Sequence, residues 1–164
     1  MGREVRRVPK DWEHPKDENG NYIPQSDWSY SQMMQEWEEG LGLWLKGEHP
    51  DQLDVRWSTD DITWEEWHGN RPDPGRYMPD WPDEERTHYQ MYEDTSEGTP
   101  ISPVMESPES LARWLADNNV SAFADMTASY EAWLRIAKGG YAPGAVLVVG
   151  GFQSGVEALK DEEP

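Results

Sequence analysis

The pattern of apolar and polar positions is clearest in the stretch that follows Ser107. Ser107 is a favourable N-cap residue, and Pro108 would occupy the first helical position, where the missing proline N–H costs nothing. The pair Asn118–Asn119 then supplies residues that tolerate the left-handed conformation at a helix end. The pattern predicts a capped, amphipathic helix. Its apolar face, at the spacing i, i+3 and i+4, consists of Leu111, Trp114 and Leu115.

Helical spacing recurs in three other segments. From Ser31 to Lys46, Gln and Glu side chains lie off an apolar face. The residues expected on or near that face are Met33, Met34, Trp37, Leu41, Trp44 and Leu45. A short helix is expected near Ile62–Trp67. Thr127 is a suitable cap for a further helix, which Gly139–Gly140 would end. The apolar positions of this last helix are Tyr130, Trp133, Leu134 and Ala137.

Two segments have the composition of strands. Aromatic and strand-compatible residues run from His88 to Glu93, and the breaker cluster Ser96–Pro100 should end this strand. Near the C-terminus, Ala145–Val149, Gly150–Gly151 and Phe152–Val156 follow one another like a β-hairpin with a two-glycine turn. We therefore expect an α+β fold. A small antiparallel sheet, made of the first strand and the C-terminal hairpin, would pack on two or three short helices.

The 164 residues suffice for one ordinary domain, so we expect a single domain over residues 1–164. Residues 86–164 hold the predicted strands and the two capped helices, and should form the α+β core. Residues 1–85 are acidic, rich in Trp and interrupted by prolines, and should wrap around that core as loops and helices. The basic N-terminus is interpreted as an arm that lies back on the acidic body. It consists of Arg3, Arg6, Arg7 and Lys10.

Composition favours folded segments joined by polar loops. Hydrophobic residues make up only 35% of the chain, but it contains ten Trp and seven Tyr, and each large aromatic can bury roughly 150–250 Å². The absence of cysteine predicts neither disulfides nor a thiolate metal site. No apolar run approaches the ~18 residues of a membrane span, and no signal peptide is evident. These features predict a soluble, intracellular protein.

Charge narrows the range of partners. The chain has 33 acidic and 14 basic residues, which give a formal net charge of −19 and a pI near 4.4. Bare nucleic acid and anionic membranes would repel such a chain, because both bind basic surfaces. Basic proteins would attract it, in particular those with a channel that holds nucleic acid.

The titratable residues show no recognisable catalytic or metal-binding pattern. The four histidines have no partner histidine at metal-ligand spacing. Two Glu-Glu-His groupings, within residues 65–68 and 84–88, could in principle hold a metal, but such neighbours occur by chance in a Glu-rich chain. No phosphate loop, dinucleotide fingerprint or nucleophile elbow is present. We therefore expect no catalytic residues, no metal and no cofactor.

Acidic residues alternate with Trp in the first half of the chain, and two interpretations remain open. The carboxylates could serve solubility by keeping an aromatic-rich chain monomeric. Alternatively, they could imitate duplex phosphates, which occur about every 1.7 Å of helix axis, with Trp side chains as anchors. On the second interpretation, the candidate partner-binding residues are Glu36, Glu38, Glu39, Asp51, Asp54, Trp57, Asp60, Asp61, Trp64, Glu65, Glu66 and Trp67.

Two blocks of the sequence resemble small uncharacterised proteins of tailed bacteriophages and prophages. The first is Arg3–Pro9 (REVRRVP), and the second, which is more specific, joins Glu97–Val104 (EGTPISPV) to Ser107–Asn118 (SPESLARWLADN). The similarity continues through Ser121–Phe123 and Thr127–Leu134, so it covers roughly half of the chain. Some of these relatives carry a cysteine-rich, zinc-ribbon-like insert, whereas this chain has no Cys. The resemblance implies a phage or prophage origin and no catalytic residues.

Charge and resemblance together suggest a function. We expect a non-enzymatic phage accessory protein that binds and inhibits a host protein in the bacterial cytoplasm, such as an anti-CRISPR-like inhibitor or a nucleic-acid mimic. The expected partner has a basic surface, as a nucleic-acid-binding complex does. Neither bare nucleic acid nor a membrane is expected to bind. The alternatives are a virion or assembly-associated structural protein, which would associate with particles, and an enzyme.

Overall fold

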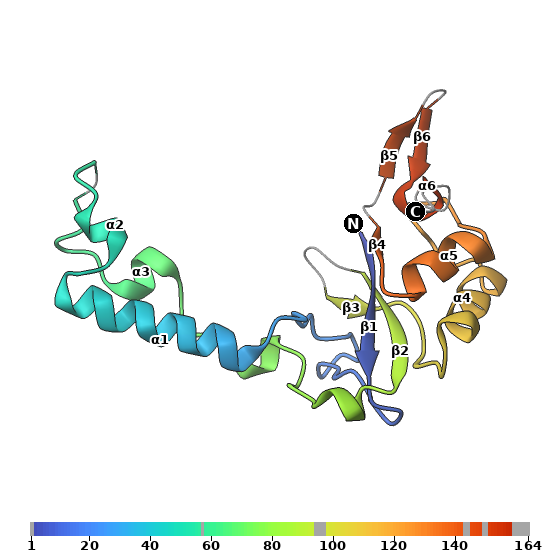
Figure 1. Ribbon diagram of the computed structural model, residues 1–164, viewed down its shortest axis with the longest axis horizontal. Coiled ribbons are helices and arrows are strands. Elements are labelled where there is room, and N and C mark those ends of the chain that lie inside the picture. Colours follow the sequence, from blue (N-terminus) through green and yellow to red (C-terminus); the bar gives the residue numbers. More distant parts are fainter. Residues whose placement is uncertain (1, 57, 94–97, 143–144, 149–150, 159–164) are drawn as a thin grey trace. The chain divides into compact units, whose positions relative to one another are not determined.

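The chain forms two compact units, each with its own apolar core (Figure 1). The computed structural model describes residues 2–56, 58–93, 98–142, 145–148 and 151–158. Unit 1 comprises Met1–Gln25 and Trp81–Pro164, and unit 2 comprises Ser26–Asp80. The predicted division at residue 85 is therefore not the one observed. The first 25 residues belong to the same unit as the predicted core.

Unit 1 is built on a four-stranded antiparallel sheet with the order β3-β2-β1-β4, so the N-terminal strand is central. β1 pairs with β2 over its whole length, with Val5 opposite Met91. β4 pairs with the N-terminal end of β1, and β3 pairs with the C-terminal end of β2. The strands are β1 (Arg3–Val8), β2 (His88–Glu93), β3 (Thr99–Pro100) and β4 (Tyr141–Ala142).

The α+β class and the bounds of β2 are confirmed, but the composition of the sheet differs from the prediction. The C-terminal hairpin, β5 (Ala145–Val148) and β6 (Gly151–Ser154), forms a separate two-stranded sheet. The second strand of the hairpin is also shorter than predicted, because the chain continues as the short helix α6 (Gly155–Ala158). Residues 149–150 of the predicted turn lie outside the described residues.

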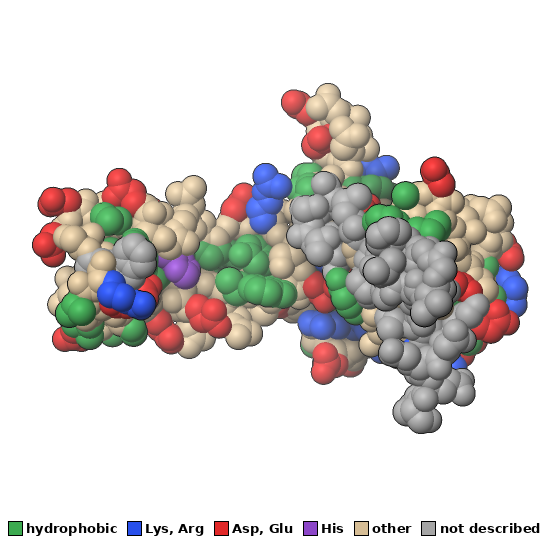
Figure 2. Space-filling model, turned by 90° about the horizontal axis from the view of Figure 1, so that it is seen from above, with side chains coloured by type: hydrophobic (Ala, Val, Ile, Leu, Met, Phe, Trp, Pro, Cys, Tyr) green, Lys and Arg blue, Asp and Glu red, His purple; other side chains and the backbone are tan. Residues whose placement is uncertain are grey.

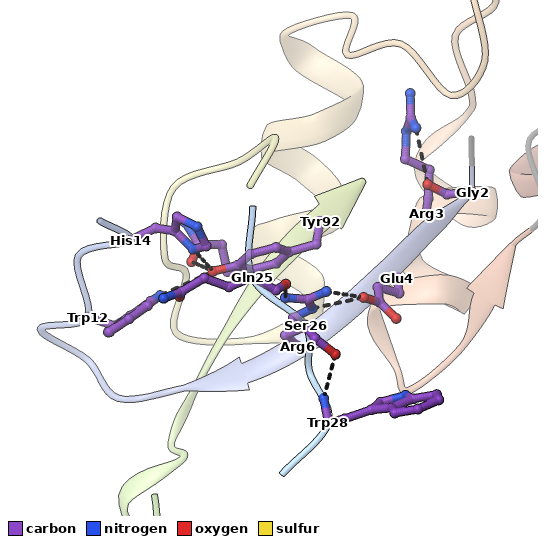
Figure 3. A network of polar contacts seen from close by, with 11 residues as sticks. Gly2, Arg3, Glu4, Arg6, Trp12, His14, Gln25, Ser26, Trp28 and Tyr92 are labelled. Carbon is purple, nitrogen blue, oxygen red and sulfur yellow. Dashed lines mark hydrogen bonds and ion pairs between the residues drawn. The ribbon is translucent and has the colours of Figure 1, made fainter. Parts of the chain in front are cut away.

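The N-terminal segment is a strand where the sequence predicts a charged arm. Arg3 and Arg6 are only 6% and 4% exposed. Arg6 donates to the Glu4 carboxylate at 2.6 and 2.8 Å and to the Gln25 carbonyl at 2.8 Å (Figure 3). Its guanidinium also lies 4.2 Å from the centroid of the Tyr92 ring. These partners satisfy the buried charge, so arginine can occupy a central strand.

Two helices pack on one face of the sheet, namely α4 (Pro108–Asp117) and α5 (Tyr130–Ala137) (Figure 1). The predicted cap of α4 is confirmed, because the Ser107 hydroxyl accepts from a backbone N–H three residues later at 3.0 Å. α5 is capped by Ser129 in place of the predicted Thr127. The helices and the sheet share a buried cluster that includes Met91, Leu111, Leu115, Ala132, Trp133 and Ile136.

Unit 2 is helical. Its long helix α1 (Tyr30–Lys46) and its short helix α3 (Trp64–His68) confirm the helices predicted near these positions, and α2 (Pro50–Leu53) is a further single turn. Unit 2 also contains the 3₁₀ turn η1 (Pro74–Arg76), and unit 1 contains η2 (Asp83–Glu85). The core of unit 2 lies between α1 and α3 and consists of Met34, Trp37, Trp44 and Trp64.

Candidate partner-binding surface

All of the acidic residues predicted to bind a partner fall in unit 2. Met34, Trp37 and Trp44 of α1 face the core, and the glutamates of α1 lie on the outer face. α3 does the same, because Trp64 faces inward and the two glutamates that follow it face outward. Asp54 is half-buried. The exposed carboxylates are Glu36, Glu38, Glu39, Asp51, Asp60, Asp61, Glu65 and Glu66.

Short-range contacts orient the carboxylates of α1. Glutamines one turn earlier in the helix donate hydrogen bonds to Glu36 at 3.1 Å and to Glu39 at 2.9 Å. Arg71 pairs with Glu38 at 3.2 Å, and both side chains are well exposed. Such an exposed pair contributes about 0–1 kcal/mol, so a partner could displace Arg71 at little cost.

Two of the predicted carboxylates are already engaged within unit 2. Arg56 Nη2 lies 2.7 Å from Asp54 Oδ2, and the hydrogen bonds from the Arg56 side chain are the main reason that the pKa of Asp54 is lowered. Asp51 accepts a hydrogen bond from Trp67 Nε1 at 2.9 Å and lies 3.6 Å from His49 Nδ1. Both carboxylates are less available to a partner than the sequence suggests.

Glu66 has a structural role at the start of α3. Its Oε2 accepts from both the backbone N–H and the hydroxyl of Thr63 at 2.8 Å, and Thr63 Oγ1 accepts from the Glu66 N–H at 3.3 Å. This is a reciprocal capping box, and the backbone hydrogen bond from Thr63 is the main cause that lowers the pKa of Glu66. By contrast, the side chains of Asp60, Asp61 and Glu65 have no hydrogen bond or ion pair within the described residues.

The tryptophans predicted as anchors are largely taken up by the core. Trp64 is 2% exposed, and its ring stacks on His68 with a centroid separation of 4.3 Å. Trp67 is half-buried and stacks on Trp44 at 5.9 Å. Trp57 lies outside the described residues. Trp64 therefore cannot anchor a partner, since reaching it would require opening the core of unit 2.

Sequence reasoning missed a set of exposed aliphatic side chains close to the acidic positions. Leu45 is 78% exposed, Leu53 is 66% exposed and Val55 is fully exposed. The signal for Leu45 was present in the sequence, because a residue that follows the buried Trp44 is turned about 100° around the helix, away from the core. Leu53 and Val55 flank Asp54 in a segment without predicted structure, where no periodicity could reveal their exposure.

Unit 2 carries a strong excess of negative charge. It has thirteen Asp and Glu against four Lys and Arg, so nine of the nineteen excess negative charges lie here. Two of the four basic residues, Arg56 and Arg71, are paired with carboxylates of the same unit. Figure 2 shows red carboxylates distributed over unit 2, at the left of the view, with few blue side chains among them.

Within the part of the chain that the structure describes, no three His, Asp or Glu side chains are placed to hold a metal ion together. The Glu-Glu-His groupings at residues 65–68 and 84–88 thus do not form such a cluster. The His68 ring is instead stacked on Trp64. Nor does any helix of the described residues have the length and apolarity to cross a membrane.

Comparison with known proteins does not extend this description. No protein-family model, curated protein or solved structure matches the chain.

Proposed function

We propose that unit 2 binds the basic surface of a host protein that itself binds nucleic acid, and that it competes with nucleic acid for that surface. One observation carries the proposal. Within unit 2 the rings of Trp37, Trp44 and Trp64 fill the interior, while the unit as a whole carries an excess of nine negative charges. Solubility alone would not require these charges to be concentrated in a small helical unit with its own core.

The spacing of the carboxylates supports this proposal. Glu36 and Glu39 lie three residues apart on one side of α1, which corresponds to about 4.5 Å along the helix axis. Successive phosphates on one strand of duplex DNA are about 3.4 Å apart along the axis. A rigid helix with such carboxylates offers a basic groove a comparable series of negative charges. Long-range attraction would also speed association and would weaken as salt is added.

Charge alone would bind basic surfaces indiscriminately, so specificity needs apolar contacts as well. Leu45, Leu53 and Val55 supply them in place of the predicted tryptophans. Burying one such side chain contributes about 1.5–3 kcal/mol. The proposed surface thus combines three open carboxylates, Asp60, Asp61 and Glu65, with exposed aliphatic residues of the same unit.

The sequence resemblance supplies the biological setting of the proposal. A phage or prophage protein that blocks a basic, nucleic-acid-binding host complex would act as an anti-defence inhibitor in the bacterial cytoplasm. A CRISPR effector is one such complex, because it holds nucleic acid in a positively charged channel. The proposal requires no catalysis and no cofactor.

Charge reversal tests the proposal. The full chain carrying Asp60→Lys, Asp61→Lys and Glu65→Lys is compared with wild type as bait in a bacterial lysate, and retained proteins are identified. The matched control makes the same change of charge in unit 1, at the exposed residues Asp83, Glu84 and Glu85. We expect a nucleic-acid-binding protein to be retained by wild type and by the control, and lost with the unit 2 variant.

Two results would contradict the proposal. The first is that both variants lose the retained nucleic-acid-binding protein equally, which would mean that only the overall charge of the chain determines binding. The second is assembly of the purified wild-type chain into particle-sized oligomers without retention of a host protein, which would favour the virion-associated alternative.

A further inference from the structure

Unit 1 contains an open groove that the proposed function of unit 2 does not use. Its volume is about 940 Å³, and it lies between the Trp12–Tyr22 segment, the chain around Pro100–Val104 and the side chain of Trp114 on α4. This volume is at the upper end of the range of small-ligand sites, roughly 300–1,000 Å³. Its lining is dominated by aromatic rings and prolines, namely Trp12, Tyr22, Trp114, Pro15, Pro100 and Pro103.

Most polar groups of the groove wall are hydrogen-bonded within the protein. Trp12 Nε1 donates to the Tyr92 hydroxyl at 3.1 Å, and His14 Nδ1 lies 3.0 Å from the same hydroxyl (Figure 3). Gln90 Nε2 donates to the Ser102 carbonyl at 2.9 Å, and Gln90 Oε1 accepts from Tyr92 at 3.1 Å. A ligand would therefore find few free acceptors for its own N–H groups on this wall.

Besides the Lys16 ammonium, two neutral hydrogen-bond donors of the groove have no partner among the described residues. Trp114 Nε1 and the Tyr22 hydroxyl have no hydrogen-bond partner among the described residues, and neither is a buried orphan. Both belong to rings that line the groove. The free chemistry of the groove thus consists of donors beside aromatic faces, which suits a ligand that brings carbonyl oxygens and few N–H groups.

A proline-rich peptide has this chemistry. Proline lacks the backbone N–H, so such a segment brings few donors to be desolvated, while each residue still brings a carbonyl oxygen. In the polyproline II conformation the segment is already extended and loses little entropy on binding. Grooves lined by aromatic side chains are the usual sites for such peptides.

Charge at the groove adds a second requirement. The Glu13 side chain is exposed and has no hydrogen bond or ion pair within the described ranges, whereas Lys16 Nζ lies 4.9 Å from the centroid of the Tyr22 ring. The groove is thus lined by one unpaired carboxylate, Glu13, and by the Lys16 ammonium over the Tyr22 ring, on a chain with a formal net charge of −19. A ligand with Arg or Lys beside its prolines would complement it.

We propose that this groove binds a proline-rich segment of a partner protein, in the polyproline II conformation and with Arg or Lys beside the prolines. The Trp114 indole N–H and the Tyr22 hydroxyl donate to carbonyl oxygens of the peptide, the three aromatic rings hold its prolines, and Glu13 pairs with its basic residue. This site is separate from the acidic surface of unit 2, and either one can fail without the other.

The test uses the full chain and an array of synthetic decapeptides with two prolines at PxxP spacing and one flanking arginine. Scrambled peptides that lack this spacing are the ligand control. We expect binding of array members, with a shift of the Trp114 indole N–H resonance. Trp114→Ala should weaken binding about tenfold or more, as for an interface anchor. Trp28→Ala, which removes an exposed Trp of unit 2, should leave binding unchanged.

Milder variants keep the test decisive if Trp114→Ala disturbs the fold. Trp114→Phe keeps a ring and removes the N–H, so it should weaken binding less than Trp114→Ala. Glu13→Gln should weaken binding of peptides with arginine and leave peptides with leucine in its place unaffected, whereas the exposed Glu106 outside the groove should tolerate Glu106→Gln. The charge-reversed unit 2 variant should bind the peptides as wild type does.

The proposal is overturned if no array peptide binds, if scrambled peptides bind equally well, or if Trp28→Ala weakens binding as much as Trp114→Ala. If arginine peptides shift the Trp114 resonance equally in wild type and in Glu13→Gln, the assigned role of Glu13 is overturned.

Discussion

Gly40 and Gly42 lie two residues apart on α1 but have different surroundings. A Cβ added at Gly40 would lie 2.4 Å from Cζ2 of the buried Trp64 ring, whereas a Cβ at Gly42 would meet nothing within 4 Å. Gly40→Ala should therefore destabilise unit 2 by about 1–3 kcal/mol through overpacking. Gly42→Ala, the matched control, should stabilise it by about 0.5–1 kcal/mol, because alanine favours the helix. Urea denaturation followed by Trp fluorescence measures both, and equal shifts would contradict the packing of Trp64 on α1.

The surroundings of His14 lower the pKa of its imidazole ring. Its ring is 7% exposed, and its Nε2 lies 2.6 Å from the Ile23 carbonyl, which can only accept. We therefore assign the proton of the neutral ring to Nε2. Burial lowers the pKa below the ordinary value of 6.5, and the Arg6 guanidinium lowers it further, against an opposing effect of the hydrogen bond to Ile23.

This shift predicts a loss of stability in acid. Because the pKa of His14 is lower in the folded state, the unfolded chain takes up the proton first as the pH falls. The stability contributed by neutral His14 is complete above about pH 6.5 and is lost as the pH falls from there to the lowered pKa. His14→Gln should reduce the change in thermal midpoint between pH 7.5 and 5.5. The same pH dependence in wild type and His14→Gln would contradict this assignment.

The residues of the candidate site show how far sequence can reach. Exposure of the carboxylates was predictable, because charged side chains seldom leave water without a partner. The burial of Trp64 was not predictable, because it depends on the close approach that Gly40 of α1 allows to this residue of α3. The capping role of Glu66 was open to prediction, because Thr63 and Glu66 have the spacing of a capping box.

Among the elements, α4 illustrates a helix with two different faces. Leu111 and Leu115 are fully buried, while Trp114, on the same predicted face, is half-buried and lines the groove. Leu115→Ala should cost about 2–5 kcal/mol of stability. Trp114→Ala should cost less, because much of its ring is already in contact with water. Chemical denaturation of the two variants checks this order, and a larger loss for Trp114→Ala would place its ring in the core.

The predictability of each element follows from where its pairing partners lie. α1, α4 and β2 carry their signals locally, as apolar spacing, caps and aromatic residues, and their positions were predicted. β1 was missed because Arg3 and Arg6 occupy buried positions. Partners distant in the sequence, the Ser121 and Gln25 carbonyls, help to make these positions acceptable. β3 and β4 have two residues each and exist as strands only through the neighbours they pair with.

At the level of the whole molecule, the two units differ in their structural features. Unit 1 holds the sheet, the buried arginines and the aromatic groove, and unit 2 holds a Trp-filled core under an acidic surface. Sequence alone did not separate them, because the acidic region was interpreted as a wrapping for the sheet. Periodicity predicts that the Trp residues of this region are buried, but it does not predict in which core. The second core contains Trp37, Trp44 and Trp64.

On the proposed function, the acidic surface of unit 2 and nucleic acid occupy the same basic surface of a host protein. The direct measurement is competition, in which the host protein retained by the full chain is titrated with duplex DNA at low salt. We expect the DNA to displace the chain fully from the host protein. We also expect the affinity of the chain for the host protein to fall with added salt, because the Debye length shrinks from about 10 Å at 0.1 M to about 3 Å at 1 M salt. If the host protein still binds the chain at saturating DNA, the proposed competition is contradicted.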